Sequence, residues 1–456
     1  MGESRLEEYL SNPAKGLWKL TVPVMVGMGV QTIYTIVDMI FVGRLSGDAI
    51  AAVAFNMPLF FFVLGLTFGL GSGVTASIAR FIGAKDKINA DNSAEHAVIM
   101  GLGISIVLTT IGLVYGKQIL FSIGATADVA DLGWSYLRVI CVGLPFMVLS
   151  TFFRSILAGE GDTKFPMTVA ALGTVLNIIL DPIFIFTLGL GVAGAAWATA
   201  ISQIIVFIIF VYMLFVKEHS YITFRLRDFE PSSFIMKDII KVGLPASMSM
   251  VIMSIGQLIF NRILVHFSTD AVAAYQIGGR IDMVIFLPIL SIAFGLTTLV
   301  GMFNGAQEMD KVKYIIKYGL IRSFLITVVI SIIVYTFAPQ LIMGFTKDIY
   351  IQNTAVKYLR LMSMIYPLVA TALPCGRILQ GFGLGMPLLI ITSIRVLLLS
   401  SPLAAFFIFI QGRPLEWIWY SIMISAVVSC VVALTWLYWA IRKFSLTKIQ
   451  TSITST

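Results

Sequence analysis

The sequence predicts an all-α membrane protein of about twelve transmembrane helices, built as two six-helix lobes. Three observations predict this fold: the composition, the long apolar segments and an internal repeat. Of the 456 residues, 58% are hydrophobic and only 12% are charged, and the mean hydropathy is +0.96. A soluble protein of this length needs a far more polar surface. Lipid offers backbone groups no hydrogen-bond partners, so the spanning segments should be helices.

The apolar segments approach the length of about 20 residues that a helix needs to cross a bilayer. The first six spans are expected at 16–41, 51–79, 95–115, 132–157, 165–187 and 193–216. The second six are expected at 238–265, 274–302, 315–338, 354–380, 388–410 and 415–441. Lys and Arg are more frequent in the loops that share a side with both termini, which favours cytoplasmic termini by the positive-inside rule. The net charge of +8 thus reflects topology in the cell membrane and does not indicate a nucleic-acid partner.

An internal repeat relates the two sets of spans at a constant offset in residue number, which for two prolines is 245 − 23 = 222. The matches include Pro23 with Pro245, Tyr136-Leu137-Arg138 with Tyr358-Leu359-Arg360, and Trp197 with Trp419. We therefore expect an amino-terminal lobe at 1–216, a cytoplasmic connector at 217–237 and a carboxyl-terminal lobe at 238–456. Parallel repeats of this kind typically place a substrate site near the midplane between the halves, which favours transport. The alternative is a fusion that serves only stability.

Two carboxylates inside the amino-terminal spans are the main candidates for chemistry. Asp38 lies late in the first span and Asp181 lies in the fifth. A charged group at the bilayer centre costs roughly 2.5–3.5 kcal/mol, so it usually has a partner or a function. Asn177 shares a helix face with Asp181, and Pro182 deprives the Ile178 carbonyl of its helical partner. These oxygen atoms suit a proton or a hard cation such as Na⁺, whereas the structural alternative is hydrogen bonding between helices.

Other residues in the spans carry weaker signals. Pro23, followed by Gly27 and Gly29, makes the first helix bendable, either as a moving hinge or as a static kink. The positions equivalent to Asp38 and Asp181 in the second half are Phe260 and Leu403. Asp282 is the acidic residue deep in that half, and its role stays open. Interhelical roles are open to Arg154, Arg377 and Arg395, with structural pairing as the simpler interpretation.

The pattern does not favour an enzyme or a bound cofactor. Cys141, Cys375 and Cys430 are far apart within apolar segments, and the three histidines are scattered. Neither arrangement has the spacing of a metal site, and no HExxH or GxSxG motif is present. Na⁺ at the carboxylate site is the one metal ion that we consider.

Several motifs together resemble the MATE family of multidrug and toxic compound extrusion transporters. The resemblance runs from about Lys15 to Arg442 and is similar to the prokaryotic branch often called DinF-like. Its most specific pieces are Pro23 with Gln31-Thr32-Ile33-Tyr34 and Asp38, Gly159-Glu160-Gly161-Asp162, Leu176-Asn177-Ile178-Ile179-Leu180-Asp181-Pro182, and Gly194-Ala195-Ala196-Trp197-Ala198-Thr199.

The resemblance implies a cation or proton site formed by Asp38, Asn177, Asp181 and Thr199. It also implies that Pro23 lets the first helix bend, with Gln31 and Tyr34 beside the site. NorM-type members rely instead on acidic residues in the carboxyl-terminal lobe, and the seventh span here has no carboxylate beyond Asp238.

As a function, the resemblance implies an antiporter that exports small organic, often cationic, molecules in exchange for H⁺ or Na⁺ by alternating access. We expect a monomer in the cell membrane, surrounded by lipid. The nearest alternative is a flippase for lipid-linked precursors from the related superfamily, which would need a cavity rich in basic residues. A membrane-embedded enzyme would need a metal or nucleophile cluster.

Overall fold

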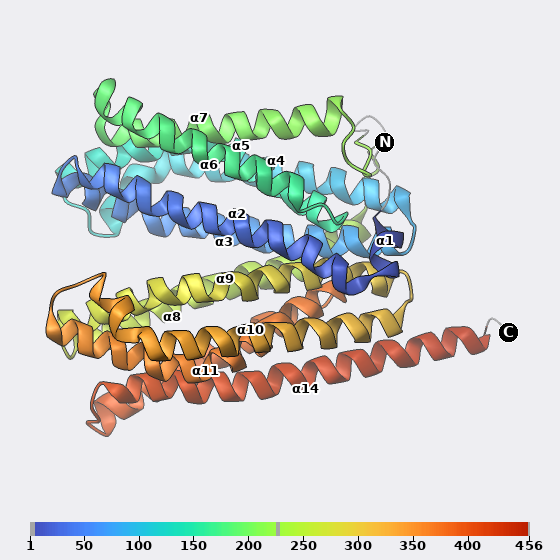
Figure 1. Cartoon of the computed structure of the whole chain (residues 1–456). Helices are drawn as coiled ribbons and strands as arrows, with labels where there is room; N and C mark the ends of the chain where they lie inside the picture. The colour runs from blue at the N-terminus through green and yellow to red at the C-terminus, as the bar shows by residue number, and fades with distance from the viewer. Residues whose placement is uncertain (1–4, 225–228, 455–456) are drawn as a thin grey trace. The chain divides into compact units, whose positions relative to one another are not determined.

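The computed structural model describes residues 5–224 and 229–454, and all the regular structure in these residues is helical (Figure 1). Eleven of the described helices are long and apolar enough to cross a membrane. The helix α2 (Pro13–Gly43), which is 31 residues long, provides a twelfth. The predicted all-α membrane fold is therefore confirmed.

The first half of the chain contains seven α-helices, two of which continue as π-helical turns. These are α1 (Leu6–Ser11), α2, α3 (Gly47–Gly83), α4 (Lys87–Ser122), α5 (Ala127–Gly159), α6 (Lys164–Pro182) with a π-helix at Ile183–Thr187, and α7 (Gly191–Val211) with a π-helix at Tyr212–Val216.

The second half repeats the order of the spans, but its fifth span is divided into α12 and α13, and α14 replaces the pair of α7 and its π-helix. It contains α8 (Ser233–Val265), α9 (Thr269–Gly305), α10 (Met309–Met343), α11 (Ile349–Gly381), α12 (Met386–Ser393) with a π-helix at Ile394–Ser400, α13 (Ser401–Ala405) with a π-helix at Phe406–Ile410, and α14 (Glu416–Thr454).

The internal repeat is reproduced in the helix boundaries. Both ends of α3 and α9 keep the offset of 222 (269 − 47 and 305 − 83), and so do both ends of α5 and α11 (349 − 127 and 381 − 159). The N-caps are repeated as well: Ser46 accepts from Ala49 N and Ser268 accepts from Ala271 N, each at 3.0 Å. The two halves are thus copies of one structural unit.

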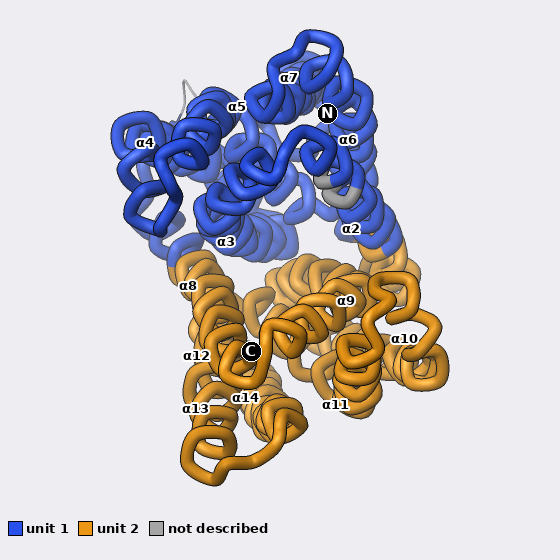
Figure 2. Tube along the Cα trace, turned by 90° about the vertical axis from the view of Figure 1, so that its left-hand side faces the viewer, with its two compact units in different colours: residues 1–6, 22–240 blue, residues 7–21, 241–456 orange. Residues whose placement is uncertain are grey.

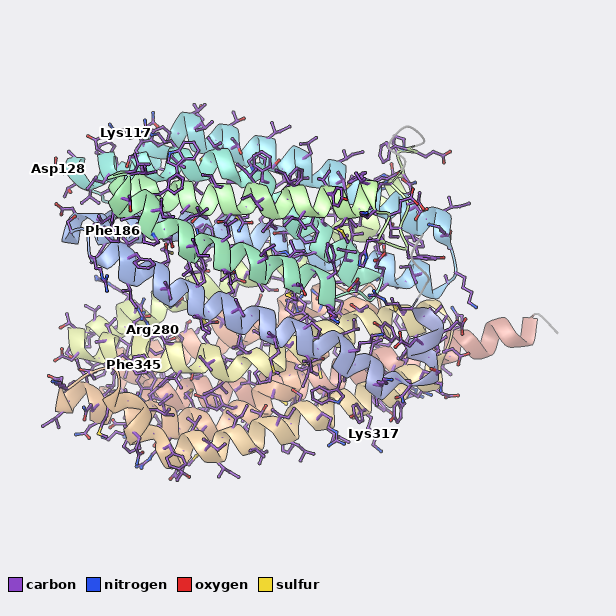
Figure 3. All side chains as sticks on the ribbon, turned by 45° about the horizontal axis from the view of Figure 1, so that its top comes forward. Lys117, Asp128, Phe186, Arg280, Lys317 and Phe345 are labelled. Atoms are coloured by element: carbon purple, nitrogen blue, oxygen red, sulfur yellow. The ribbon has the colours of Figure 1, made fainter. Side chains whose placement is uncertain are left out.

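The helices extend beyond the apolar segments that predicted them. The third span was expected at 95–115, but α4 runs from Lys87 to Ser122 because polar residues continue its hydrogen-bonding pattern, with Asp86 capping Asn89 N at 3.1 Å. At the other end of α4, Lys117 forms an ion pair with Asp131 near the start of α5. Figure 3 shows Lys117 and Asp128 close together at this end of the hairpin.

The chain divides into two compact units, each a bundle of helices (Figure 2). Unit 1 comprises residues 1–6 and 22–240, and unit 2 comprises residues 7–21 and 241–456. Both α2 and α8 therefore contribute one end to each unit. Within unit 2, the α2 residues Leu17 and Leu20 are fully buried and lie against Gly295 of α9. The predicted lobe boundaries at 216 and 238 remain a prediction.

Candidate functional site

The fifth and sixth spans bring three of the predicted site residues together. Asn177 and Asp181 on α6 are 3% and 0% exposed, and Thr199 lies opposite them on α7. In the amide orientation that satisfies both neighbours, Asn177 donates to Asp181 Oδ2 at 3.2 Å and accepts from Thr199 N at 3.0 Å. In the other orientation, its nitrogen donates to Thr199 Oγ1 at 3.3 Å. Asn177 therefore links the carboxylate to α7.

The first span adds Tyr34 and Asp38 to this group. The Tyr34 hydroxyl lies 3.5 Å from Thr199 Oγ1. Asp38 lies close enough to Asp181 for the two carboxylates to interact through their charges. The structure thus places the predicted residues of α2, α6 and α7 around one point within unit 1. These are Tyr34, Asp38, Asn177, Asp181 and Thr199.

One oxygen of this site is available as an acceptor. Asp181 Oδ1 is buried and receives no hydrogen bond from the residues that the structure describes. A buried acceptor without a donor is costly, and a bound proton or cation would remove that cost. The adjacent charge of Asp38 strengthens the attraction for either ligand. The arrangement can therefore bind a small positive charge.

The chain near Asp181 departs from α-helical geometry, as expected for a proline at this position. Pro182 is the last residue of α6, and a π-helical turn follows, in which Leu188 N donates to Ile183 O at 2.8 Å. Because proline has no N–H, it interrupts the regular bonding pattern one residue after the carboxylate. Such π-helical turns are frequent at functional sites.

The other two predicted residues, Pro23 and Gln31, lie earlier on α2. Pro23 lies inside the continuous helix, about four helical turns before Asp38. Gln31 is exposed. Of the two glycines that follow Pro23, Gly27 packs against Met167, whose Sδ lies 2.6 Å from the position that a Cβ would take, whereas Gly29 has no atom within 4 Å of that position.

The structure adds one residue that the sequence reasoning did not assign to the site. Tyr136 of α5 lies close enough to both Asp38 and Asp181 to interact with their charges. Tyrosine is common in membrane helices, so its presence in a span carried no signal. In the structure, its repeat partner Tyr358 also lies against a carboxylate.

That second carboxylate is Asp282 of α9. Tyr358 donates to Asp282 Oδ2 at 2.5 Å, and Tyr366 donates to Oδ1. Both tyrosines belong to α11, so the carboxylate links two helices of unit 2. Two phenol donors stabilise the charged form. These hydrogen bonds of Asp282 are made within unit 2.

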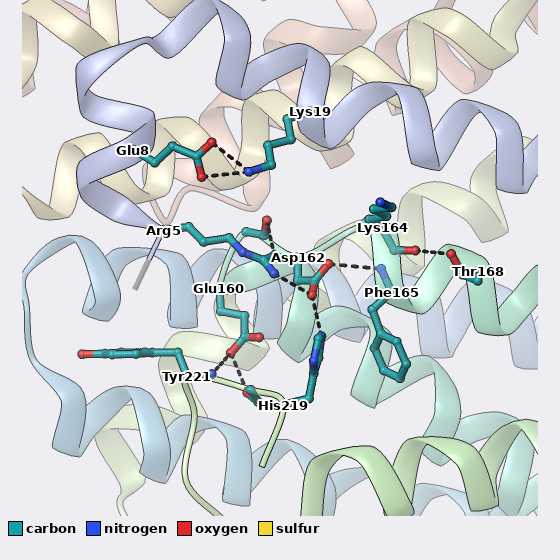
Figure 4. Close-up of polar contacts among 12 residues, drawn as sticks. Arg5, Glu8, Lys19, Glu160, Asp162, Lys164, Phe165, Thr168, His219 and Tyr221 are labelled. Carbon is teal, nitrogen blue, oxygen red and sulfur yellow. Dashed lines mark hydrogen bonds and ion pairs between the residues drawn. The ribbon is translucent and has the colours of Figure 1, made fainter. Parts of the chain in front are cut away.

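The Glu160 and Asp162 motif has a different role, because it holds the connector (Figure 4). Glu160 accepts from Ser220 Oγ at 2.5 Å and from Tyr221 N at 3.0 Å, whereas Asp162 binds Arg5 at 2.9 Å and His219 at 3.0 Å. Burial raises the pKa of Glu160 to about 7, although these hydrogen bonds oppose the shift. Burial would also raise the pKa of Asp162, but the hydrogen bond and charge of Arg5 hold it below its usual value.

Comparison with known proteins agrees with this architecture. The sequence model of the MatE family matches twice, at residues 23–183 and 245–406. The starts of the two matches have the same offset (245 − 23 = 222), so the matches cover both copies of the repeat. The chain belongs to the MATE family. It is a multidrug efflux transporter by family and not an enzyme.

Relatives of this MATE transporter match over most of their length. "Probable multidrug resistance protein NorM" of Thermotoga maritima is 30% identical over 407 residues, which cover 87% of this chain and 86% of that protein. A solved structure described as an "outward-facing conformation of a multidrug resistance MATE family transporter of the MOP superfamily" is 34% identical, with a TM-score of 0.93, and covers 98% of this chain and 99% of the other.

A second solved structure is equally similar to this MATE transporter. It comes from Pyrococcus furiosus, with 34% identity, a TM-score of 0.93 and coverage of 98% and 99%. It is described by the words "reverse polarity of binding pocket suggests different function of a MOP superfamily transporter". That statement concerns the other protein. For this chain, the named relatives favour multidrug efflux and do not favour a flippase.

Proposed function

We propose that this MATE transporter is an antiporter that exports small organic, often cationic, molecules in exchange for H⁺ or Na⁺. The observation that carries the proposal is the fully buried carboxylate of Asp181 with an unbonded oxygen, close to a second carboxylate at Asp38. Among the described residues, no basic group acts on either carboxylate, and two such charges attract one proton or one monovalent cation.

The cation controls the conformation in this proposal. When the ion binds, it removes the repulsion between Asp38 and Asp181, so α2 can approach α6 more closely. Ion release restores the repulsion and favours the other state. By linkage, if the bound ion lowers the affinity for substrate, then bound substrate lowers the affinity for the ion by the same factor. This reciprocity converts an ion gradient into export by alternating access.

The first helix is the moving element in this scheme. Asp38 and Tyr34 lie on the part of α2 that follows Pro23, and the missing N–H of Pro23 lowers the cost of bending there. The proposed setting is the cell membrane, with both termini in the cytoplasm and the chain acting as a monomer among lipids. The coupling ion is its only proposed inorganic ligand.

The test is transport in proteoliposomes with separate proton and sodium gradients. We expect uptake of a fluorescent organic cation to follow one of the two gradients in the wild-type protein. Asp38→Asn and Asp181→Asn should each abolish gradient-driven transport, because a neutral amide cannot exchange a charge. Asp310→Asn, which removes an exposed carboxylate outside this site, serves as the matched control. Undiminished gradient-driven transport by both site variants would exclude the mechanism.

A further inference from the structure

One face of unit 2 combines exposed basic and aromatic side chains. It is formed by the first four turns of α10, and we call it the α10 basic face. Its members are Lys313, Tyr314 and Lys317, which project within about a third of the helix circumference, and Tyr318 lies at its edge. Lys313, Lys317 and Arg322 are exposed, and Tyr314 is 50% exposed. Lys317 projects outward from its helix in Figure 3.

The aromatic residues of this face are held in a fixed arrangement. Tyr314 and Tyr318 stack with ring centroids 6.0 Å apart and an angle of 16° between the rings. The guanidinium of Arg322 lies over the Tyr318 ring at 5.1 Å, and Trp18 of α2 donates to the Tyr318 hydroxyl at 3.0 Å. The side chains are thus positioned before any ligand binds. Tyr and Trp are the residues enriched at the level of lipid headgroups.

Along α10, exposed acidic residues are followed by basic residues and then by apolar residues. Glu308 and Asp310 are exposed at the start of the helix, and Lys313 and Lys317 follow one and two turns later. Beyond Arg322, the exposed residues are apolar: Phe324, Leu325, Val329 and Ile332. The basic residues therefore lie at the border between the polar end of the helix and its apolar surface. That border is where a phospholipid phosphate meets its acyl chains.

The repeat shows what covers the corresponding face of unit 1. At an offset of 222, Lys313 and Tyr314 correspond to Asp91 and Asn92 on α4, and Tyr318 corresponds to His96.

These three α4 residues bind the connector directly. Asp91 accepts from Thr223 N at 3.0 Å, Asn92 donates to Glu230 O at 3.0 Å, and His96 accepts from Ser232 N at 2.9 Å. In unit 1, therefore, this face is covered by the chain itself.

In unit 2, Trp18 of α2 contacts Tyr318, but Lys313, Tyr314 and Lys317 stay exposed among the described residues. The counterpart of residues 217–232 is 439–454 (217 + 222 and 232 + 222), and these residues continue α14 as a helix. The sequence from Trp439 to Thr456 contains Arg442, Lys443 and Lys448 but no Asp or Glu. Charge complementarity therefore excludes this tail as the occupant of a basic face.

We propose that the α10 basic face binds the headgroup of an anionic phospholipid. Lys313 and Lys317 would contact the phosphate, Tyr314 would contact the glycerol region, and the apolar residues beyond them would pack against the acyl chains. In the orientation proposed above, this is the cytoplasmic leaflet. The lipid would take the place that the connector takes on unit 1.

The test uses the purified full-length transporter in mixed micelles of dodecyl maltoside with either phosphatidylglycerol or phosphatidylcholine. Native mass spectrometry would count the lipids retained. We expect selective retention of phosphatidylglycerol, and roughly 10- to 30-fold weaker binding in the double variant Lys313→Gln/Lys317→Gln, since each basic residue near a membrane surface contributes about 1 kcal/mol. Raised salt should weaken the wild-type binding.

The control is Lys347→Gln/Lys357→Gln, which removes the same charge near the far end of α10 and the start of α11. It should retain wild-type lipid binding. Equal retention of the two lipids, or no effect of Lys313→Gln/Lys317→Gln, would overturn the proposal. Soluble glycerol phosphate that competes as well as the lipid would also overturn it, because the ligand would then be a free phosphate. The measurement needs no transport, so its failure leaves the antiport proposal standing.

Discussion

At the scale of single residues, the carboxylates of the site could be predicted because charge is rare and costly inside membrane helices. Asp38 and Asp181 were conspicuous for that reason, and the spacing of four residues linked Asn177 to Asp181. Tyr136 could not be found in this way, because aromatic residues are ordinary in such helices. The partners of Asp282 also required the structure, since they lie on another helix, 76 and 84 residues away.

Glu160 should make the stability of the protein depend on pH. Its pKa is about 7 in the folded chain and 4.5 for an ordinary glutamate, so the protonated form is favoured by folding. This contribution is fully present below about pH 4.5 and is lost as the pH rises through 7, up to about 3 kcal/mol. We expect Glu160→Gln, which stays neutral, to flatten the fall in unfolding free energy between these values. Unfolding experiments in detergent across this pH range would measure the unfolding free energy of both proteins.

Asp162→Asn is the control for this experiment, because the pKa of Asp162 is shifted downward. Its stabilising contribution is present above the usual pKa of an aspartate and is lost only as the pH falls through its lower folded value. Asp162→Asn should therefore lower stability throughout the range without changing the slope between pH 4.5 and 7. An unchanged slope in Glu160→Gln would contradict the prediction.

At the scale of helices, the sequence located every span but underestimated most of their lengths. Apolar runs end where the hydrocarbon ends, whereas helical hydrogen bonds continue through polar residues until a cap stops them. The caps themselves follow from the repeat, as at Ser46 and Ser268. Only the π-helical turn that follows Pro182 could be predicted. The others lie within apolar segments, whose composition does not reveal a change in the hydrogen-bonding pattern.

Helix packing depends on two equivalent glycines at the ends of α5 and α11. A Cβ on Gly381 would lie 2.8 Å from the backbone oxygen of Thr297, and one on Gly159 would lie 3.0 Å from that of Thr75. We expect Gly381→Ala to lower the unfolding free energy by about 1–3 kcal/mol, because backbone atoms cannot move aside easily. Gly103→Ala, with no atom within 4 Å, should be neutral or slightly stabilising. Denaturant unfolding in detergent would compare the two variants.

At the scale of the molecule, the repeat predicted two copies of one unit, but it did not predict that each unit is completed by residues from the other half. The offset between matched residues contains no information about which helix ends pack together. Unit 2 includes residues 7–21, and unit 1 extends to Ile240 on α8. This exchange depends on tertiary contacts such as those of Leu17 with Gly295.

The exchange makes the two halves of the chain dependent on each other. We expect the fragment 233–456 to aggregate when expressed alone, because the surface around Gly295 would lack Leu17 and Leu20. Co-expression with the fragment 1–232 should restore a monodisperse complex in size-exclusion chromatography, whereas co-expression with 22–232 should not. A monodisperse 233–456 fragment would show that residues 7–21 are dispensable.

The burial of Leu17 against Gly295 also implies a delay during biosynthesis, because the two residues are made at different times. The ribosome makes Leu17 early and must add 295 − 17 = 278 further residues before its partner exists. At about 5–20 residues per second, that interval is roughly 15–60 s. During this time the beginning of the first helix has no final neighbour, so a chaperone, lipid or the insertion machinery must shield it. The start of α2 therefore meets its partner only after α9 has been made.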